Sequence, residues 1–206
     1  MSGHRFNPEK AAKLLDPKRK ELVDPVKIIS LLHIQEGDFV ADFGAGNGFF
    51  TVPIANKTKE TVYAIDVQEQ MLHYLKKQAQ QEGVTNIEYV FSDVENIPLK
   101  SNSIDKGLIA FVIHEVSNLD PAVEEMFRVL KPNGKLLILD WEAIESEMGP
   151  PVHERISSKK LNDYFRQKGF QPELFRFHEA IYGMLITNGK NEVNSSIFHD
   201  PKEGTS

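Results

Sequence analysis

The residues best suited to chemistry lie in a glycine-rich segment, Val40-Ala41-Asp42-Phe43-Gly44-Ala45-Gly46-Asn47-Gly48. Alternating glycines let the backbone come within contact distance of a ligand, because no Cβ intrudes. The helix expected after this loop adds unpaired backbone N–H groups at its first turn. The segment therefore indicates a nucleotide-type binding loop, although a tight strand-to-helix turn without a ligand would use the same glycines.

Two further carboxylates follow the next two predicted strands. Asp66 ends the strand expected over residues 61–66, where a carboxylate can accept hydrogen bonds from a ribose diol. Asp93 follows the strand expected over residues 87–91. Because ligands of doubly wound sheets bind at the carboxyl ends of the strands, we expect Asp42, Asp66 and Asp93 to share one crevice. Three carboxylates disfavour a pyrophosphate and favour a ligand with an ammonium, a sulfonium, a diol and an exocyclic amine.

An alternation of strands and helices positions these residues. Strands are predicted over residues 39–43, 61–66, 87–91, 108–113 and 135–141, and helices over 26–34, through 54–55, over 68–81 and from Asp120 onward. Asp24 and Asp120, each followed by proline, are the expected N-caps of two of these helices. Pro53 requires its helix to begin near Thr51 or to kink. Such alternation specifies a parallel sheet with helices on both faces.

The pattern changes toward the end of the chain. A helix near residues 157–168 is followed by apolar runs over 174–177 and 181–187, joined by three residues. This connection is too short for a parallel crossover, so the two strands are expected to be antiparallel. The predicted fold class is therefore α/β, with a doubly wound, mostly parallel seven-stranded sheet, an antiparallel C-terminal hairpin and helices on both faces. We predict one domain over residues 1–188, with 1–34 as a helical lid region, and a polar tail over 189–206.

The composition narrows the possible functions. A chain of 206 residues with 40% hydrophobic residues fits one globular domain. The absence of cysteine excludes disulfides, thiolate metal sites and cysteine nucleophiles, and the seven histidines are too scattered for a metal site. A net charge of −6 disfavours nucleic acid as a partner. No apolar run is long enough to span a membrane, and the first ten residues lack the layout of a secretory signal, so a cytoplasmic location is expected.

Four blocks of the sequence, taken in order, resemble a known family. They are Val40–Gly48, Val62–Asp66, Ser92–Pro98 and Arg128–Asp140. In this combination they are similar to the motifs of class I S-adenosylmethionine-dependent methyltransferases, especially the small group similar to quinone-biosynthesis C-methyltransferases. The resemblance spans about residues 26–187.

The resemblance implies S-adenosylmethionine as cofactor and assigns residues to its parts. Gly44 and Gly46 would border the methionine part, Asp66 would hold the ribose hydroxyls, and Asp93 would contact the adenine amine. Asp42 would lie near the amino group of the ligand, directly or through water. The predicted cofactor-binding set is Asp42, Gly44, Ala45, Gly46, Asp66, Val67, Ser92, Asp93, Val94 and Phe111, with Val67 and Val94 flanking the adenine ring.

The acceptor is expected beyond the fourth and fifth strands. Methyl transfer from a sulfonium is an in-line displacement, so alignment and exclusion of water can supply much of the acceleration. If the acceptor must lose a proton, His114 is the candidate base; the alternative is a histidine that caps or packs. Trp141 is either a partly buried wall or a cation–π partner. The family often has a small polar residue where Phe111 stands, which leaves backbone contacts there. Residues 4–6 could fold over the pocket or fray.

Two other functions fit parts of the pattern. An NAD(P)-dependent oxidoreductase would also use Asp66, but its loop would read G-x-G-x-x-G, whereas this one reads G-x-G-x-G. A non-catalytic ligand-binding protein could keep the same fold. The chain also resembles arsenite methyltransferases in its core, but it lacks the cysteines that those enzymes use. A small-molecule acceptor is therefore predicted, and its identity and the oligomeric state are left open.

Overall fold

The computed structural model describes residues 23–189 of the chain. Of the predicted lid region 1–34, only residues 23–34 are described, and they include two short helices. The contact predicted for residues 4–6 and all but residue 189 of the tail predicted over 189–206 lie outside the described residues, so the lid and the tail stay predictions.

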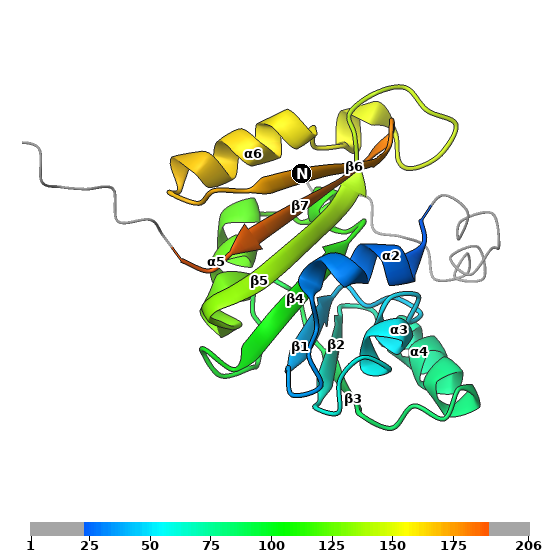
Figure 1. Cartoon of the computed structure of the whole chain (residues 1–206). Helices are drawn as coiled ribbons and strands as arrows, with labels where there is room; N and C mark the ends of the chain where they lie inside the picture. The colour runs from blue at the N-terminus through cyan, green and yellow to red at the C-terminus, as the bar shows by residue number, and fades with distance from the viewer. Residues whose placement is uncertain (1–22, 190–206) are drawn as a thin grey trace, which may run out of the picture.

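Within the described residues, seven strands form one sheet in the order β3-β2-β1-β4-β5-β7-β6 (Figure 1). The strands are β1 (Val40–Phe43), β2 (Val62–Asp66), β3 (Ile87–Phe91), β4 (Ile104–Ala110), β5 (Leu130–Trp141), β6 (Glu173–His178) and β7 (Ile181–Thr187). The first five pair in parallel, and β7 lies antiparallel between β5 and β6. The predicted fold class is confirmed, including the antiparallel C-terminal hairpin.

Helices cover both faces of this sheet (Figure 1). They are α2 (Pro25–Ile29), η2 (Ser30–Leu32), α3 (Thr51–Ala55), α4 (Glu69–Gln81), η3 (Ile113–Glu115), α5 (Leu119–Val129), η4 (Val152–Glu154) and α6 (Ser158–Gln167). Buried residues of α5 and α6 share one hydrophobic cluster, and those of α2 and α3 share another on the opposite face. Alternate residues of each central strand supply the two clusters, because neighbouring side chains of a strand point to opposite faces.

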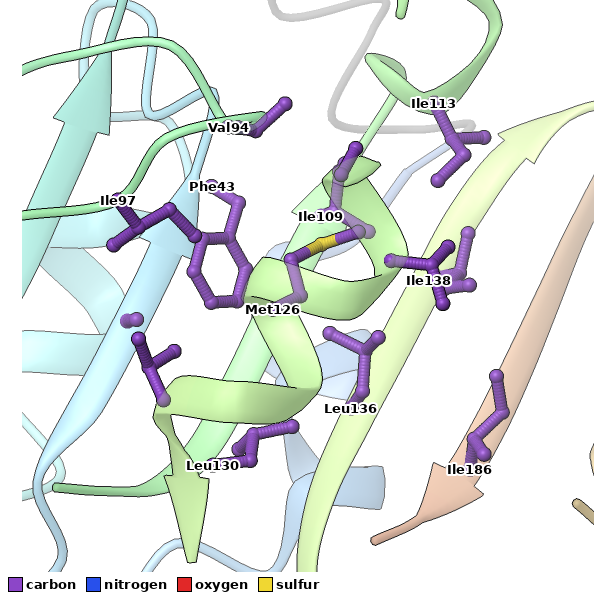
Figure 2. Packing of buried hydrophobic residues seen from close by; sticks show 14 of the residues in the cluster. Phe43, Val94, Ile97, Ile109, Ile113, Met126, Leu130, Leu136, Ile138 and Ile186 are labelled. Carbon is purple, nitrogen blue, oxygen red and sulfur yellow. The ribbon is translucent and has the colours of Figure 1, made fainter. Parts of the chain in front are cut away.

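Phe43 shows how the first cluster is built. Its ring packs with Ile109 of β4 and Met126 of α5, and Figure 2 shows Met126 pointing from its helix into this group. Gly107 makes room for the ring, since a Cβ there would lie 2.8 Å from Phe43 Cε2. This packing holds the carboxyl ends of β1 and β4 side by side, and both ends belong to the candidate site.

The fourth strand differs from the prediction. It was expected over residues 108–113 but spans Ile104–Ala110, and residues 113–115 form η3. The physical reason is Phe111, whose φ of +58° is left-handed and interrupts the extended backbone. The apolar run continues past the break because Phe111 and Ile113 are buried.

Of the two predicted helix N-caps, Asp24 is confirmed and Asp120 is not. Asp24 accepts the N–H groups of Val26 and Lys27, so this N-cap is confirmed. The predicted cap Asp120 is wrong, because α5 begins at Leu119 and its N-cap residue is Asn118. α3 begins at Thr51, which places Pro53 in the first turn, where a missing N–H costs no helical hydrogen bond.

Candidate functional site

The glycine loop, residues 44–48, joins β1 to α3. Its three glycines have φ values of +79°, +54° and +95°, all left-handed. The first two N–H groups of the loop donate to the carbonyl of Ile65 at the end of β2, at 2.8 and 2.9 Å. A Cβ on Gly44 would lie 2.5 Å from Cγ2 of Val112, so the loop packs directly against the segment after β4. Glycine is therefore required both by the backbone conformation and by this close approach.

Asp66 fastens the glycine loop to the end of β2. Its Oδ2 accepts the N–H of Gly46 and its Oδ1 accepts the N–H of Gln68, both at 2.8 Å. The residue is 8% exposed. Burial raises the pKa of Asp66, and the N–H groups of Gln68, Gly46 and Val67 offset part of that rise. A carboxylate has about four lone-pair sites, so after these three N–H groups one remains for a further donor.

Asp42 lies at the base of the same loop and is 1% exposed. Its Oδ2 accepts the hydroxyl of Thr51 at 2.6 Å. Burial raises the pKa of Asp42 to about 7; the Thr51 hydrogen bond opposes this shift, and the charge of Asp66 adds to it. A cation bound beside Asp42 would favour the charged carboxylate and so would bind more tightly than a neutral group.

The segment after β3 adjoins these residues. The N–H of Ser92 donates to the carbonyl of Asp66 at 3.1 Å, and the Ser92 hydroxyl donates to the carbonyl of Asn96 at 2.7 Å. Asp93 is half-buried, and its Oδ1 accepts the N–H of Glu95. Val94 packs in the hydrophobic cluster around Phe43. The structure thus brings Ser92 and Asp66 together and turns Val94 toward the core.

Phe111 and Trp141 form an aromatic wall after β4 and β5. Their ring centroids are 4.9 Å apart. Two other residues lie close to the Trp141 ring: the guanidinium of Arg155 lies 5.7 Å from the ring centroid, and a Cβ on Gly149 would lie 2.7 Å from Cδ2 of the ring. The geometry favours the interpretation of Trp141 as a wall, because a cation from the protein already uses its π-system.

Arg155 organises the loop that follows β5, residues 142–157. Its guanidinium and Nε donate to the backbone carbonyls of Glu142, Ile144, Met148 and Pro150 and to the hydroxyl of Ser146. The sequence did not predict this role of Arg155, which is buried. An arginine in a polar stretch is usually a surface residue, and the backbone carbonyls that it binds cannot be recognised in a sequence.

His114 is held by Asp140, the penultimate residue of β5. Its Nδ1 lies 2.7 Å from Oδ1 of Asp140, and the two side chains are 6% and 0% exposed. Burial lowers the pKa of His114, but the hydrogen bond to Asp140 and the charges of Asp140, Glu115 and Glu154 outweigh burial, so the pKa is raised. Asp140 was not predicted as a site residue. The signal for it was present, since β4 and β5 were expected to end at the same edge of the sheet.

A hollow of about 580 Å³ lies between α4 and β3, lined by residues that include His73, Lys76, Tyr89 and Phe91. It reaches the end of β3 at Phe91 but shares no residue with the glycine loop. Among residues 23–189, no three His, Asp or Glu side chains are grouped to hold a metal ion. In the same part of the chain, no helix has the length and apolar character needed to cross a membrane.

Known proteins share both the sequence pattern and the fold. Residues 41–138 match the family model described as "Methyltransferase domain". A crystal structure of a SAM-dependent methyltransferase from Aquifex aeolicus is 34% identical, with a TM-score of 0.83 over 90% of this chain and 100% of that one.

Two curated relatives are ubiquinone/menaquinone biosynthesis C-methyltransferases UbiE. The protein from Hydrogenovibrio crunogenus is 32% identical over 119 residues, which is 56% of this chain and 47% of that protein. The protein from Pseudomonas entomophila is 27% identical over 189 residues, or 85% of this chain and 73% of that protein. The matched part of the chain thus spans about half to three quarters of these relatives.

Proposed function

Because this chain belongs to the family of S-adenosylmethionine-dependent methyltransferases, we propose that its glycine loop, Asp42 and Asp66 bind S-adenosylmethionine for methyl transfer to a small-molecule acceptor. The family membership supports this assignment over an NAD(P)-dependent oxidoreductase. The bound cofactor supplies an electrophilic methyl group on a sulfonium. The chain itself contributes binding, orientation and exclusion of water.

The contact that carries the proposal is the one between Asp66 and Gly46. It fixes a carboxylate at the end of β2 against the backbone of a loop glycine, which has no Cβ, at 2.8 Å. A ribose diol fits this arrangement, because the Asp66 carboxylate can still accept a hydrogen bond from a hydroxyl group. An ammonium group fits beside Asp42, which is buried near the same loop. The chemistry of these residues therefore suits an adenosine that carries an amino acid.

The remaining cofactor contacts stay predictions. Asp93 is proposed to meet the adenine amine, with Ser92 beside it, Val67 and Val94 next to the ring, and Ala45 and Phe111 contributing backbone groups. The half-buried position of Asp93 and the link from Ser92 to Asp66 support this part of the proposal.

We further propose that the acceptor is a small aromatic molecule of the quinol type. Support comes from the relatives, which are C-methyltransferases of quinone biosynthesis. The aromatic pair of Phe111 and Trp141, whose rings are tilted by 39° at the ends of β4 and β5, suits contact with an aromatic ring. The cytoplasmic location expected from the sequence stays a prediction.

Calorimetric titration with S-adenosylhomocysteine tests the binding site. The parent protein should bind in the micromolar range, about −8 kcal/mol. Asp66→Ala should bind roughly 30- to 100-fold more weakly, because it loses a charged acceptor for the diol, about 2–3 kcal/mol. Glu88→Ala, an exposed change on β3, is the matched control and should bind as the parent does. Binding of oxidised NAD without binding of S-adenosylhomocysteine would disprove the proposal.

Transfer of a labelled methyl group from S-adenosylmethionine to 1,4-naphthalenediol tests the acceptor class. This quinol has a free ring carbon beside a hydroxyl group. At a cofactor concentration near the Kd of the parent, the parent should give a labelled product and Asp66→Ala should give much less, because its site is then mostly empty. Cofactor binding without transfer to the diol would reject the quinol-type acceptor and leave the binding site standing.

A further inference from the structure

We propose that Asp140 is a positioning residue that holds His114 with its proton on Nδ1, so that Nε2 accepts a proton from the methyl acceptor. This inference rests on the proposed function. It adds a second residue to the site and assigns each ring nitrogen of His114 a separate task.

Asp140 is fixed by three N–H groups. Its Oδ1 accepts the N–H of Trp141 at 2.7 Å and meets Nδ1 of His114 at 2.7 Å, and its Oδ2 accepts the backbone N–H of His114 at 3.2 Å. A carboxylate can only accept, so Nδ1 must donate. The neutral imidazole therefore has its lone pair on Nε2. The nearest carboxylate to Nε2 is Oε1 of Glu115, 3.9 Å away, which is longer than a hydrogen bond.

The position of His114 in the sheet puts it on the acceptor side. The β1 strand lies between β2, which ends at Asp66, and β4, which leads to His114. Val112, two residues before His114, packs against Gly44, so the histidine segment borders the glycine loop on the side away from the ribose-binding carboxylate. Trp141, next to Asp140, belongs to the aromatic wall proposed for the acceptor ring.

The charges around the imidazole favour proton uptake. Asp140 of β5, Glu115 of η3 and Glu154 of η4 all stabilise the imidazolium, and the pKa of His114 is raised in spite of its burial. Tyr182 of β7 also lies near Asp140, but its hydroxyl donates to the carbonyl of Ile156 and its pKa is raised by burial and by nearby carboxylates, so it stays neutral. His114 can therefore act as a base only above its raised pKa.

The methyl transfer is balanced in bonds and in charge, and it releases one proton. The acceptor atom forms a bond to the methyl carbon, the carbon–sulfur bond breaks with its electron pair going to sulfur, and the acceptor's proton goes to Nε2 of His114. The imidazolium then returns the proton to water. The positive charge of the sulfonium thus ends on the histidine and leaves with the proton.

Nitrogen NMR of the histidine rings tests the positioning role without any acceptor. In the parent, neutral His114 should be protonated on Nδ1 and should titrate above 6.5, its ordinary value. In Asp140→Asn the titration should fall by about one pH unit or more, because the carboxylate no longer stabilises the imidazolium. A neutral ring protonated on Nε2 in the parent would overturn the proposal even if Asp140→Asn does not fold. An unchanged titration in a folded Asp140→Asn would also overturn it.

Methyl transfer to 1,4-naphthalenediol tests the base. In the parent, kcat/KM should fall as pH drops through the pKa of His114, and in Asp140→Asn this limb should move to lower pH. His114→Gln should bind S-adenosylhomocysteine as the parent does but lose at least about tenfold in kcat. The control His73→Gln, an exposed histidine on α4, should match the parent. Unchanged kcat in His114→Gln would reject the base. If the parent binds S-adenosylhomocysteine but does not methylate the diol, the proposed acceptor is wrong. The NMR measurement then still tests whether Asp140 holds the proton of His114 on Nδ1.

Discussion

The burial of Asp42 lowers the stability of the folded protein where its carboxyl group is ionised, and a bound cation can offset this loss. Its pKa is about 7 in the folded protein, against a usual value of 3.8. The folded state therefore binds a proton between these two pH values that the unfolded state has released. Stability falls as pH rises through this range, by a few kcal/mol, because the carboxyl must ionise while buried. Cation binding beside Asp42 offsets that cost, so the residue makes the empty site less stable than the filled one.

Asp42→Asn should separate stability from binding. The amide does not ionise and can still accept the Thr51 hydroxyl, so the fall in unfolding free energy between pH 4 and 7 should become shallower. At pH 8 the variant should be more stable than the parent by about 1–3 kcal/mol, while S-adenosylhomocysteine binds at least about tenfold more weakly. Urea unfolding at several pH values measures the first effect, and calorimetry the second.

Asp163→Asn, at a half-exposed carboxylate of α6 that pairs with Lys159, is the control and should change neither slope nor binding. A slope in Asp42→Asn equal to that of the parent would show that the ionisation of Asp42 does not couple to folding.

Individual site residues were predictable to the extent that strand ends could be predicted. Asp42 and Asp66 lie at the ends of two apolar strands and Asp93 follows a third, and parallel strands bring such positions to one edge. Asp140 meets the same criterion at the end of β5, yet its contact with His114 depends on the turn at Phe111, whose left-handed backbone has no signature in the apolar pattern. The turn at Phe111 therefore determines that Nδ1 of His114 faces Asp140 at the end of β5.

At the scale of elements, the sequence was most informative where connection length decides topology. The predicted runs 174–177 and 181–187 were joined by only three residues, and β6 and β7 are joined by two, so only an antiparallel pair is possible, and that prediction is confirmed. It was least informative for loop 142–157. The four carbonyls that Arg155 binds are backbone atoms, which every residue has, so no residue type in this stretch identifies them.

Arg155→Lys should loosen loop 142–157. Lysine has three donors and no planar fork, so at least two of the five contacts made by Arg155 must be lost. Each lost bond costs about 1 kcal/mol, so the loop should lose roughly 2 kcal/mol of local stability. Hydrogen exchange should show faster exchange of the loop amides and unchanged protection in β1 and β4.

The control for this change is Arg166→Lys on α6, where the arginine makes a single 3.4 Å contact to Asn162. It should leave the loop amides as protected as in the parent. Equal protection in Arg155→Lys would mean that the loop is held by its packing against Trp141 and not by the arginine.

At the scale of the molecule, one sheet joins all parts of the candidate site. The glycine loop follows β1 near the centre of the sheet and Asp66 ends β2 on one side; on the other side His114 follows β4 and Asp140 lies at the end of β5. The hydrophobic clusters on the two faces fix these strands to one another. A ligand that spans the loop therefore contacts residues from several strands of one cooperative unit, and its binding energy should stabilise the whole fold.

Thermal unfolding measures this coupling. A ligand that binds only the folded state at 100 times its Kd adds about 3 kcal/mol to the free energy of unfolding. For a domain of this size, each kcal/mol shifts Tm by about 2–4 °C, so S-adenosylhomocysteine should raise Tm by about 6–12 °C. The shift should grow with the logarithm of ligand concentration, and it should shrink in Asp66→Ala at the same concentration because the site is then partly empty. Oxidised NAD should leave Tm unchanged. A loss of the S-adenosylhomocysteine shift in Glu88→Ala, whose side chain is exposed on β3, would instead place the ligand at that side of the sheet and contradict the site at the glycine loop.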